Sequence, residues 1–133
     1  MTHIIMAKSS IAPIKAITIP RLELVAALLL ARLMKKVSSK LEIGKEKITL
    51  WSDSTTALQW MKKPPSSWKT YVGNRVAQIQ ELYEFEQWRY VPTKENPADL
   101  LSRGMLASNL INCSMWFNGP TFLEEERDLW PKI

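Results

Sequence analysis

One helix-forming segment constrains the fold of this chain more than any other feature of its sequence. Residues 20–37 read PRLELVAALLLARLMKKV, and their apolar side chains fall on most faces of the helix that the pattern predicts. Pro20 suits the first turn of that helix, where its missing N–H leaves no hydrogen bond unmade. Because a helix that is apolar nearly all round has to be covered, we expect it to be buried against a sheet.

The same segment is too short to cross a membrane. Its longest apolar run without a charge covers the eight residues 24–31, whereas a spanning helix needs about 20. Residues 1–10 lack the basic start, long apolar centre and small-residue cleavage site of a secretion signal. The single cysteine, Cys113, excludes an internal disulfide framework and fits a reducing compartment. We therefore expect an intracellular, cytoplasmic protein that is not secreted.

The remaining segments alternate between strand and helix patterns. Strands are expected at residues 4–10, 47–51 and 85–92, and helices at residues 54–63, 66–84 and 96–104. This order predicts an α/β domain in which helices pack on a mixed sheet. At 133 residues the chain has room for one small domain. After Gly104 the pattern weakens, and residues 115–131 are expected to form an extended tail.

Positive charge is concentrated in the first part of the chain. Residues 1–80 hold 13 Lys and Arg against 4 Asp and Glu, a net charge of +9, while residues 81–133 carry −4. A basic segment of this kind favours a polyanionic partner such as nucleic acid. The alternative is that the lysines only solvate helix faces.

Three acidic residues occupy the same kind of position in the predicted order of elements. Glu23 lies near the start of the long helix, Asp53 between the strand at 47–51 and the next helix, and Asp99 three residues after Asn96. In open α/β sheets, sites form where strands end and helices begin. Three carboxylates that met there would suit Mg²⁺ or Mn²⁺, since these ions prefer oxygen ligands.

Each of these acids also has a purely structural interpretation. Glu23 is expected in the first helical turn, where the helix macrodipole favours a negative charge. Asp53 is a candidate N-cap, with Ser52 or Ser54 as partners in that role. Asp99 follows Asn96 at the spacing of a capping box. The spacing alone does not decide between capping and metal binding.

Three longer stretches resemble one family closely. They are IPRLELVAALLLARL, LWSDSTTALQWMKKPPSSWKTYVGNRVAQIQ and WRYVPTKENPADLLSRG. Together they resemble the ribonuclease H region in the polyprotein of BEL/Pao-type LTR retrotransposons. The tail MWFNGPTFLEEERDLWP is similar to the stretch that leads toward the integrase in those polyproteins. The resemblance extends from about residue 6 to residue 131.

The resemblance implies a fold, an activity and a set of partners. It implies a ribonuclease H-like α/β fold, with a partial domain over residues 1–106 and a tail over residues 107–133. It implies Mg²⁺- or Mn²⁺-dependent cleavage of RNA in an RNA–DNA hybrid, with Glu23, Asp53 and Asp99 as catalytic, metal-binding acids. The reverse transcriptase and integrase portions of the same polyprotein are the implied protein partners.

The chain departs from the family pattern at its start. The family site has a fourth carboxylate on its first strand, whereas residues 1–22 here contain no Asp or Glu. The domain is therefore expected to be truncated, with the first two family strands missing and the two-metal site incomplete. Tyr90 stands where related elements often carry a histidine. The alternative function is a catalytically inactive remnant that at most binds nucleic acid.

Basic residues lie among aromatic ones in the helix-rich segment that contains the predicted helices at 54–63 and 66–84. The candidate nucleic-acid-binding residues, close to Trp60 and Trp68, are Lys62, Lys63, Lys69, Asn74 and Arg75. Cations among aromatic rings suit contact with a nucleic-acid backbone. The alternative is that both tryptophans are packing residues.

Overall fold

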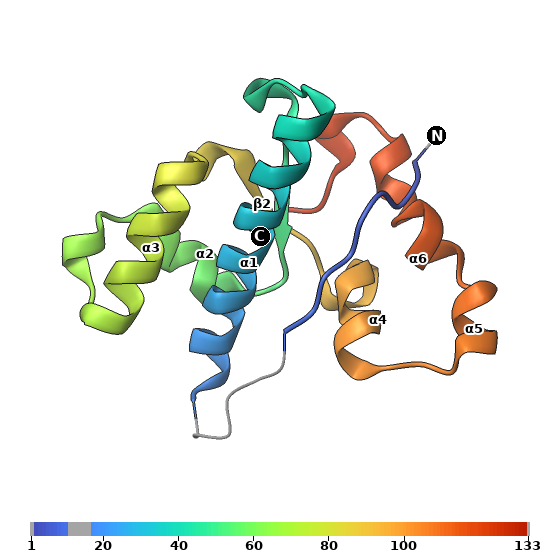
Figure 1. Cartoon of the computed structure of the whole chain (residues 1–133), viewed down its shortest axis with the longest axis horizontal. Coiled ribbons are helices and arrows are strands. Elements are labelled where there is room, and N and C mark those ends of the chain that lie inside the picture. The colour runs from blue at the N-terminus through green and yellow to red at the C-terminus, as the bar shows by residue number, and fades with distance from the viewer. Residues whose placement is uncertain (1, 11–16, 133) are drawn as a thin grey trace. The chain divides into compact units, whose positions relative to one another are not determined.

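The computed structural model describes residues 2–10 and 17–132, which form two compact units. The central unit spans Ala12–Tyr90, and the flanking unit combines Met1–Ile11 with Val91–Ile133. Figure 1 shows the chain from its N-terminus in blue to its C-terminus in red.

The central unit combines three helices with a small parallel sheet (Figure 1). Its helices and strands are α1 (Ile19–Leu41), β1 (Leu50–Ser52), α2 (Thr55–Lys62), α3 (Thr70–Leu82) and β2 (Trp88–Tyr90). β1 pairs with β2 in parallel, with Leu50 opposite Trp88 and Ser52 opposite Tyr90. The unit is mixed but dominated by helices, which is compatible with the predicted α/β class.

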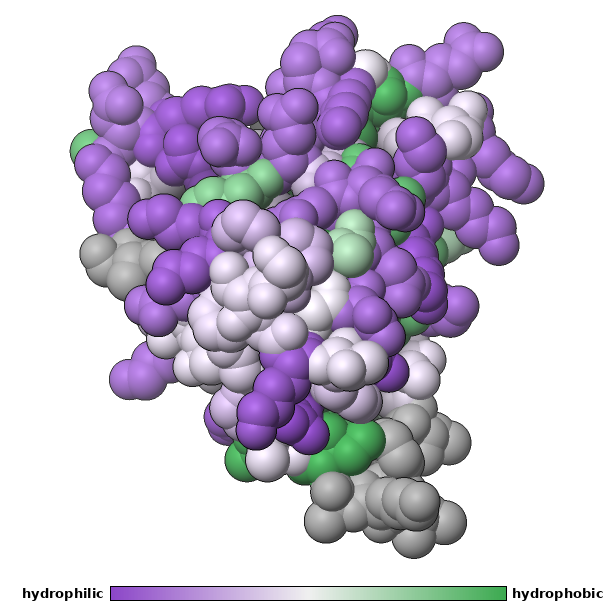
Figure 2. Space-filling view, turned by 90° about the vertical axis from the view of Figure 1, so that its left-hand side faces the viewer, coloured by the Kyte–Doolittle hydropathy of each residue, from purple (hydrophilic) through white to green (hydrophobic). Residues whose placement is uncertain are grey.

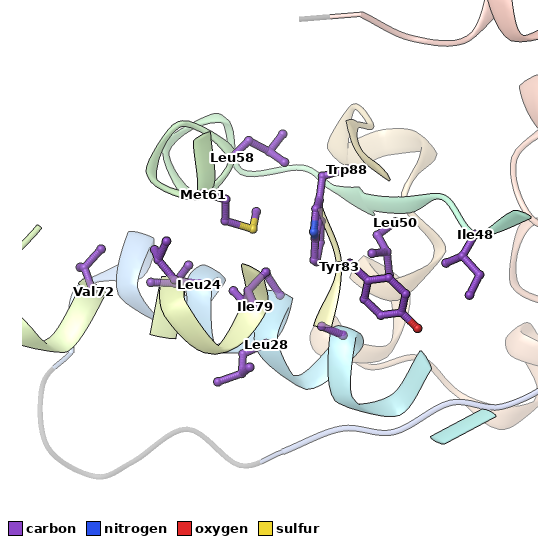
Figure 3. Packing of buried hydrophobic residues seen from close by; sticks show 13 residues of the cluster. Leu24, Leu28, Ile48, Leu50, Leu58, Met61, Val72, Ile79, Tyr83 and Trp88 are labelled. Atoms are coloured by element: carbon purple, nitrogen blue, oxygen red, sulfur yellow. The ribbon is translucent and has the colours of Figure 1, made fainter. Parts of the chain in front are cut away.

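The core of the central unit forms where α1, α2 and α3 meet the two strands. Leu24 and Leu28 of α1 are buried together with Ile79 of α3. Figure 3 shows Trp88 of β2 between Met61 and Leu50. The predicted burial of the long helix is confirmed, but α1 packs mainly on α3 and α2 and only to a lesser extent on β1. Strands of three residues offer too little surface to cover a helix of 23 residues.

α1 and α3 run side by side in the same direction (Figure 1). Near their N-terminal ends, the guanidinium of Arg21 lies over the ring of Tyr71. Further along, the side chain of Arg32 donates a hydrogen bond to that of Gln78. The N-terminal ends of both helices therefore lie at the same end of the unit.

The predicted segments of the central unit are confirmed in kind, and most are shorter than expected. The predicted strands at 47–51 and 85–92 are reduced to β1 and β2, because 3₁₀ turns occupy Lys45–Lys47 and Phe85–Gln87. A third 3₁₀ turn, Pro65–Ser67, joins α2 to α3. Gly73 lets α3 approach this turn, since a Cβ there would lie 2.8 Å from the carbonyl oxygen of Pro65.

The flanking unit contains short helices. They are α4 (Pro97–Arg103), α5 (Ala107–Ile111) and α6 (Ser114–Asn118), with 3₁₀ turns at Thr93–Glu95, Thr121–Glu124 and Arg127–Leu129. The expectation of an extended tail over residues 115–131 is therefore wrong. The predicted limits of α4 are confirmed, with Asn96 as N-cap and Gly104, at φ +79°, as the residue that ends the helix. Among the described residues, no helix is long and apolar enough to span a bilayer.

The predicted strand at residues 4–10 is wrong. Residues 2–10 have no regular secondary structure. Instead, the N–H of Ile4 donates a hydrogen bond to the carbonyl of Phe117, at 2.8 Å, and Ile5 is 71% exposed. The apolar side chains of this segment are adjacent rather than alternating, so they give no single face that a sheet would bury.

Truncation of one α1 core residue tests how far the unit depends on this helix. Leu24 is fully buried, whereas Leu41 on the same helix is 52% exposed. We expect Leu24→Ala to lower the free energy of unfolding by about 2–5 kcal/mol, through lost burial and the cavity it leaves. The matched change Leu41→Ala should stay within about 0.5 kcal/mol of wild type. Urea denaturation followed by circular dichroism measures both, and equal losses would contradict the assignment of Leu24 to the core.

Candidate functional site

Asp53 lies at the junction between β1 and α2, but it does not cap the helix. The N-cap is Ser54, whose hydroxyl accepts a hydrogen bond from the N–H of Ala57 at 3.1 Å. The hydroxyl of Ser52 in turn accepts one from the N–H of Ser54, also at 3.1 Å. The N-cap of α2 is therefore Ser54 rather than Asp53. Its half-buried carboxylate stands directly after the strand.

Glu23 lies deeper in α1 than the sequence suggested. The helix begins at Ile19, with Pro20 in its first turn, and that turn contains no acid. Glu23 thus falls in the second turn, where its side chain is half-buried. The expectation that it lies in the first turn is wrong, and so is the macrodipole interpretation, because that effect falls off within the first turn.

Asp99 lies in the first turn of α4, as expected, and pairs with an arginine. The Nε atom of Arg103 lies 2.9 Å from the Oδ2 atom of Asp99. The side chain of Arg103 is 73% exposed and that of Asp99 is 23% exposed. The Asn96 side chain accepts a hydrogen bond from the N–H of Ala98. No capping box involving Asp99 is formed at this helix start. The structural role of Asp99 is an ion pair one turn apart rather than a cap.

The three acids are divided between the two units. Glu23 and Asp53 belong to the central unit, and Asp99 belongs to the flanking unit. Within neither unit do three or more His, Cys, Asp or Glu side chains of the described residues gather as they would around a metal ion. A metal site formed by Glu23, Asp53 and Asp99 stays a prediction.

The tryptophans of the candidate nucleic-acid surface are packing residues that also hold a cation. Trp60 and Trp68 pack against the core cluster, and their ring centroids lie 6.4 Å apart. The indole N–H of Trp68 donates to the carbonyl of Trp60 at 2.9 Å. On the outside, Nζ of Lys63 lies 5.8 Å from the centroid of the Trp68 ring. The packing interpretation is confirmed, and one tryptophan also positions an exposed lysine.

The other candidate nucleic-acid-binding residues lie in different surroundings. Lys69 is the exposed N-cap residue of α3, and Asn74 is exposed on the same helix. Lys62 lines a pocket of about 560 Å³ together with Trp88 and Glu86. Lys62 therefore has an acidic side chain in its pocket, which distinguishes it from Lys69.

Arg75 lies in a cluster that sequence reasoning did not find. Its guanidinium carbon is 3.6 Å from the centroid of the Tyr71 ring, and its Nη1 donates to the Tyr71 carbonyl at 3.0 Å. The guanidinium carbon of Arg21, from α1, lies 5.2 Å from the same centroid. The i,i+4 spacing of Tyr71 and Arg75 was a signal for one of these contacts. Arg21 had no such signal, because its contact joins two helices.

The face that carries α3 is largely hydrophilic. Figure 2 shows strongly hydrophilic residues around a patch of near-neutral hydropathy on this side of the molecule. In the central unit, cations lie over aromatic rings at Lys63 and Trp68 and at Arg75 and Tyr71. An exposed surface that combines cations with aromatic rings suits a polyanion better than an apolar ligand.

The comparison with protein families concerns the first part of the chain. Residues 1–54 match the model of the Pao retrotransposon-like RNaseH-like domain. The family resemblance is confirmed over this segment. The matched segment contains both Glu23 and Asp53 and ends at Ser54, the cap of α2. No curated protein and no solved structure matches the chain.

The division of roles between Asp53 and Ser54 can be tested through stability. We expect Ser54→Ala to lower the free energy of unfolding by about 1 kcal/mol, since the N–H of Ala57 loses its partner. Thr56→Ala, an exposed site in the first turn of the same helix, is the matched control and should be neutral or slightly stabilising. Urea denaturation compares the two, and a Ser54→Ala variant as stable as the control would contradict the cap.

Proposed function

We propose that this chain is a segment of a ribonuclease H domain from a retrotransposon polyprotein. The proposed activity of the parent is divalent-metal-dependent hydrolysis of the RNA strand in an RNA–DNA hybrid. The observation that carries the proposal is the family match over residues 1–54, which includes two of the three candidate acids. The division into a domain over residues 1–106 and a tail over 107–133 stays a prediction.

The proposed metal ligands are Glu23, Asp53 and Asp99. Their carboxylate oxygens are the hard donors that Mg²⁺ and Mn²⁺ prefer. The pair between Asp99 and Arg103 is exposed on the arginine side, and such pairs are worth only about 0–1 kcal/mol. A bound cation would therefore displace Arg103 at little cost.

These residues have distinct tasks in the proposed reaction. Divalent ions would supply activation of the attacking water and stabilisation of the leaving oxygen. Glu23 and Asp53 would fix the position of the ions relative to the hybrid from a helix and a strand end. Asp99 would add a ligand from the start of α4. Four basic residues of the central unit and one amide would hold the backbone of the hybrid: Lys62, Lys63, Lys69, Arg75 and Asn74.

A second candidate function, binding without cleavage, is the one we favour for the chain by itself. Residues 1–22 contain no acid, so this chain does not supply the fourth carboxylate of the family site. Binding needs no such ligand, because exposed cations such as Lys63 and Lys69 neutralise phosphates directly. The isolated chain is therefore proposed to be a hybrid-binding remnant of the nuclease domain, and the reverse transcriptase and integrase portions are its proposed polyprotein partners.

A cleavage assay separates the two candidates. The purified chain is incubated with an end-labelled RNA–DNA hybrid and Mg²⁺, beside Asp53→Asn and the control Asp128→Asn, which makes the same chemical change at an exposed acid of the tail. We expect background cleavage in all three samples and a band shift of the hybrid at low salt that weakens as salt increases.

The other outcomes decide against this expectation in distinct ways. Mg²⁺-dependent cleavage by wild type and Asp128→Asn, but not by Asp53→Asn, would show that the chain is itself a nuclease. Absence of both cleavage and band shift at low salt would overturn both candidate functions.

A further inference from the structure

We infer that Arg21, Tyr71 and Arg75 form a contact site for the phosphodiester backbone of a nucleic-acid strand. We call these three residues the arginine–tyrosine cluster. The inference rests on the proposed binding function and assigns it two residues, Arg21 and Tyr71, that neither the sequence nor the family match had singled out.

The geometry of the cluster holds two guanidinium groups against one ring. Arg75 stacks closely on Tyr71 and is fixed a second time by its hydrogen bond to the Tyr71 carbonyl. Arg21 approaches the same ring from α1, at 5.2 Å from the centroid. Cations over an aromatic face are attracted by the ring quadrupole. The cluster is therefore pre-organised, with side chains from two helices that meet at their N-terminal ends.

The charge of the cluster is not neutralised by acidic side chains among the described residues. No Asp or Glu of this part of the chain forms an ion pair with Arg21 or Arg75. Lys69, the N-cap residue of α3, adds a third positive charge close by in sequence. The N-terminal ends of α1 and α3 contribute further positive potential, because helix dipoles point the same way there. Cations held together in this way repel one another, and an anion placed between them removes that cost.

The chemistry of the cluster favours phosphate as the anion. A guanidinium presents several N–H donors in one plane, which match two oxygens of a phosphate group. The stack on Tyr71 occupies one face of the Arg75 guanidinium, and the hydrogen bond to the Tyr71 carbonyl occupies its Nη1. The remaining N–H groups of its half-exposed guanidinium are the donors that a phosphate would meet.

The surroundings favour a nucleic-acid strand over a single phosphate. Lys69 precedes α3 by one residue, and Lys63 lies over the Trp68 ring at the end of α2, across the 3₁₀ turn Pro65–Ser67. The central unit thus carries two exposed lysines, Lys63 and Lys69, in addition to the two partly exposed arginines of the cluster. A polymer with regularly spaced phosphates can contact several of them, whereas a free phosphate contacts one. Backbone contacts of this kind do not depend on base sequence.

The test compares two charge-removing substitutions on the same helix. Arg21→Gln removes a cation of the cluster, and Lys36→Gln removes an exposed cation more than four turns further along α1. Binding of two fluorescent RNA–DNA hybrids of unrelated sequence is measured by anisotropy over a range of salt concentrations. We expect Arg21→Gln to weaken the binding of both hybrids about 5–10-fold. The slope of log affinity against log salt concentration should fall by about the value of one phosphate contact. Lys36→Gln should change the affinity by less than about twofold.

Two additional variants keep the inference testable if one substitution disturbs the fold. Tyr71→Phe keeps the ring and should bind as wild type does, whereas Arg75→Gln should weaken binding like Arg21→Gln, with thermal unfolding as the control for folding. Inorganic phosphate at millimolar concentration should compete only as ionic strength predicts, if the site needs a strand.

The outcomes separate this inference from the function on which it rests. If the wild-type chain binds the hybrids and Arg21→Gln binds them as tightly as Lys36→Gln does, the cluster is not a phosphate contact. The proposed binding function would then stay in place. A loss confined to one of the two hybrid sequences would also overturn the cluster as a phosphate contact, because a backbone contact is uniform. If inorganic phosphate competes more strongly than its ionic strength predicts, the ligand of the cluster is a small anion, and the inference of a nucleic-acid strand is overturned. No binding by wild type at low salt would overturn both proposals.

Discussion

The packing of α1 on α3 is the interaction on which the central unit depends. Leu24 and Leu28 are buried against this partner helix rather than against a broad sheet. Since the two helices run in the same direction, their contact also determines which side chains meet at each end. At one end it brings Arg21 to Tyr71, and further along it brings Arg32 to Gln78. A hydrophobic interface thus places polar groups that are distant in the sequence.

The helices of the central unit were predictable because each is specified locally. α1 follows from one long apolar segment, α2 ends before Pro64-Pro65, and α3 carries Val72, Val76 and Ile79 at helical spacing. The strand predicted at residues 4–10 does not form, because propensity alone does not make a strand: a strand exists only if a neighbour completes its hydrogen bonds. The segment 115–131 was mistaken for extended chain because a five-residue helix such as α6 is too short to give a periodic signal.

Residue types at the strand–helix junction were easier to predict than their roles. The sequence placed Ser52, Asp53 and Ser54 at the junction of β1 and α2, but any of the three is a suitable cap by composition. Only the tertiary structure shows that the N–H of Ala57 donates its hydrogen bond to the hydroxyl of Ser54. The same limit applies to Arg75, which was predicted as a phosphate contact while its stack on Tyr71 was not. Roles that depend on which atom lies within 3 Å require a tertiary structure.

Binding and cleavage make different demands on this chain. The arginine–tyrosine cluster and the neighbouring lysines lie wholly within the central unit, on α1, α2 and α3 and their connections. The candidate acids are shared between two units, with Asp99 outside the central one. A cation contributes to phosphate binding wherever it is exposed, whereas metal ligands act only when all meet at about 2 Å from one ion. Loss of a single ligand therefore removes catalysis, while a binding surface that consists of several independent cations weakens only in proportion to those it loses.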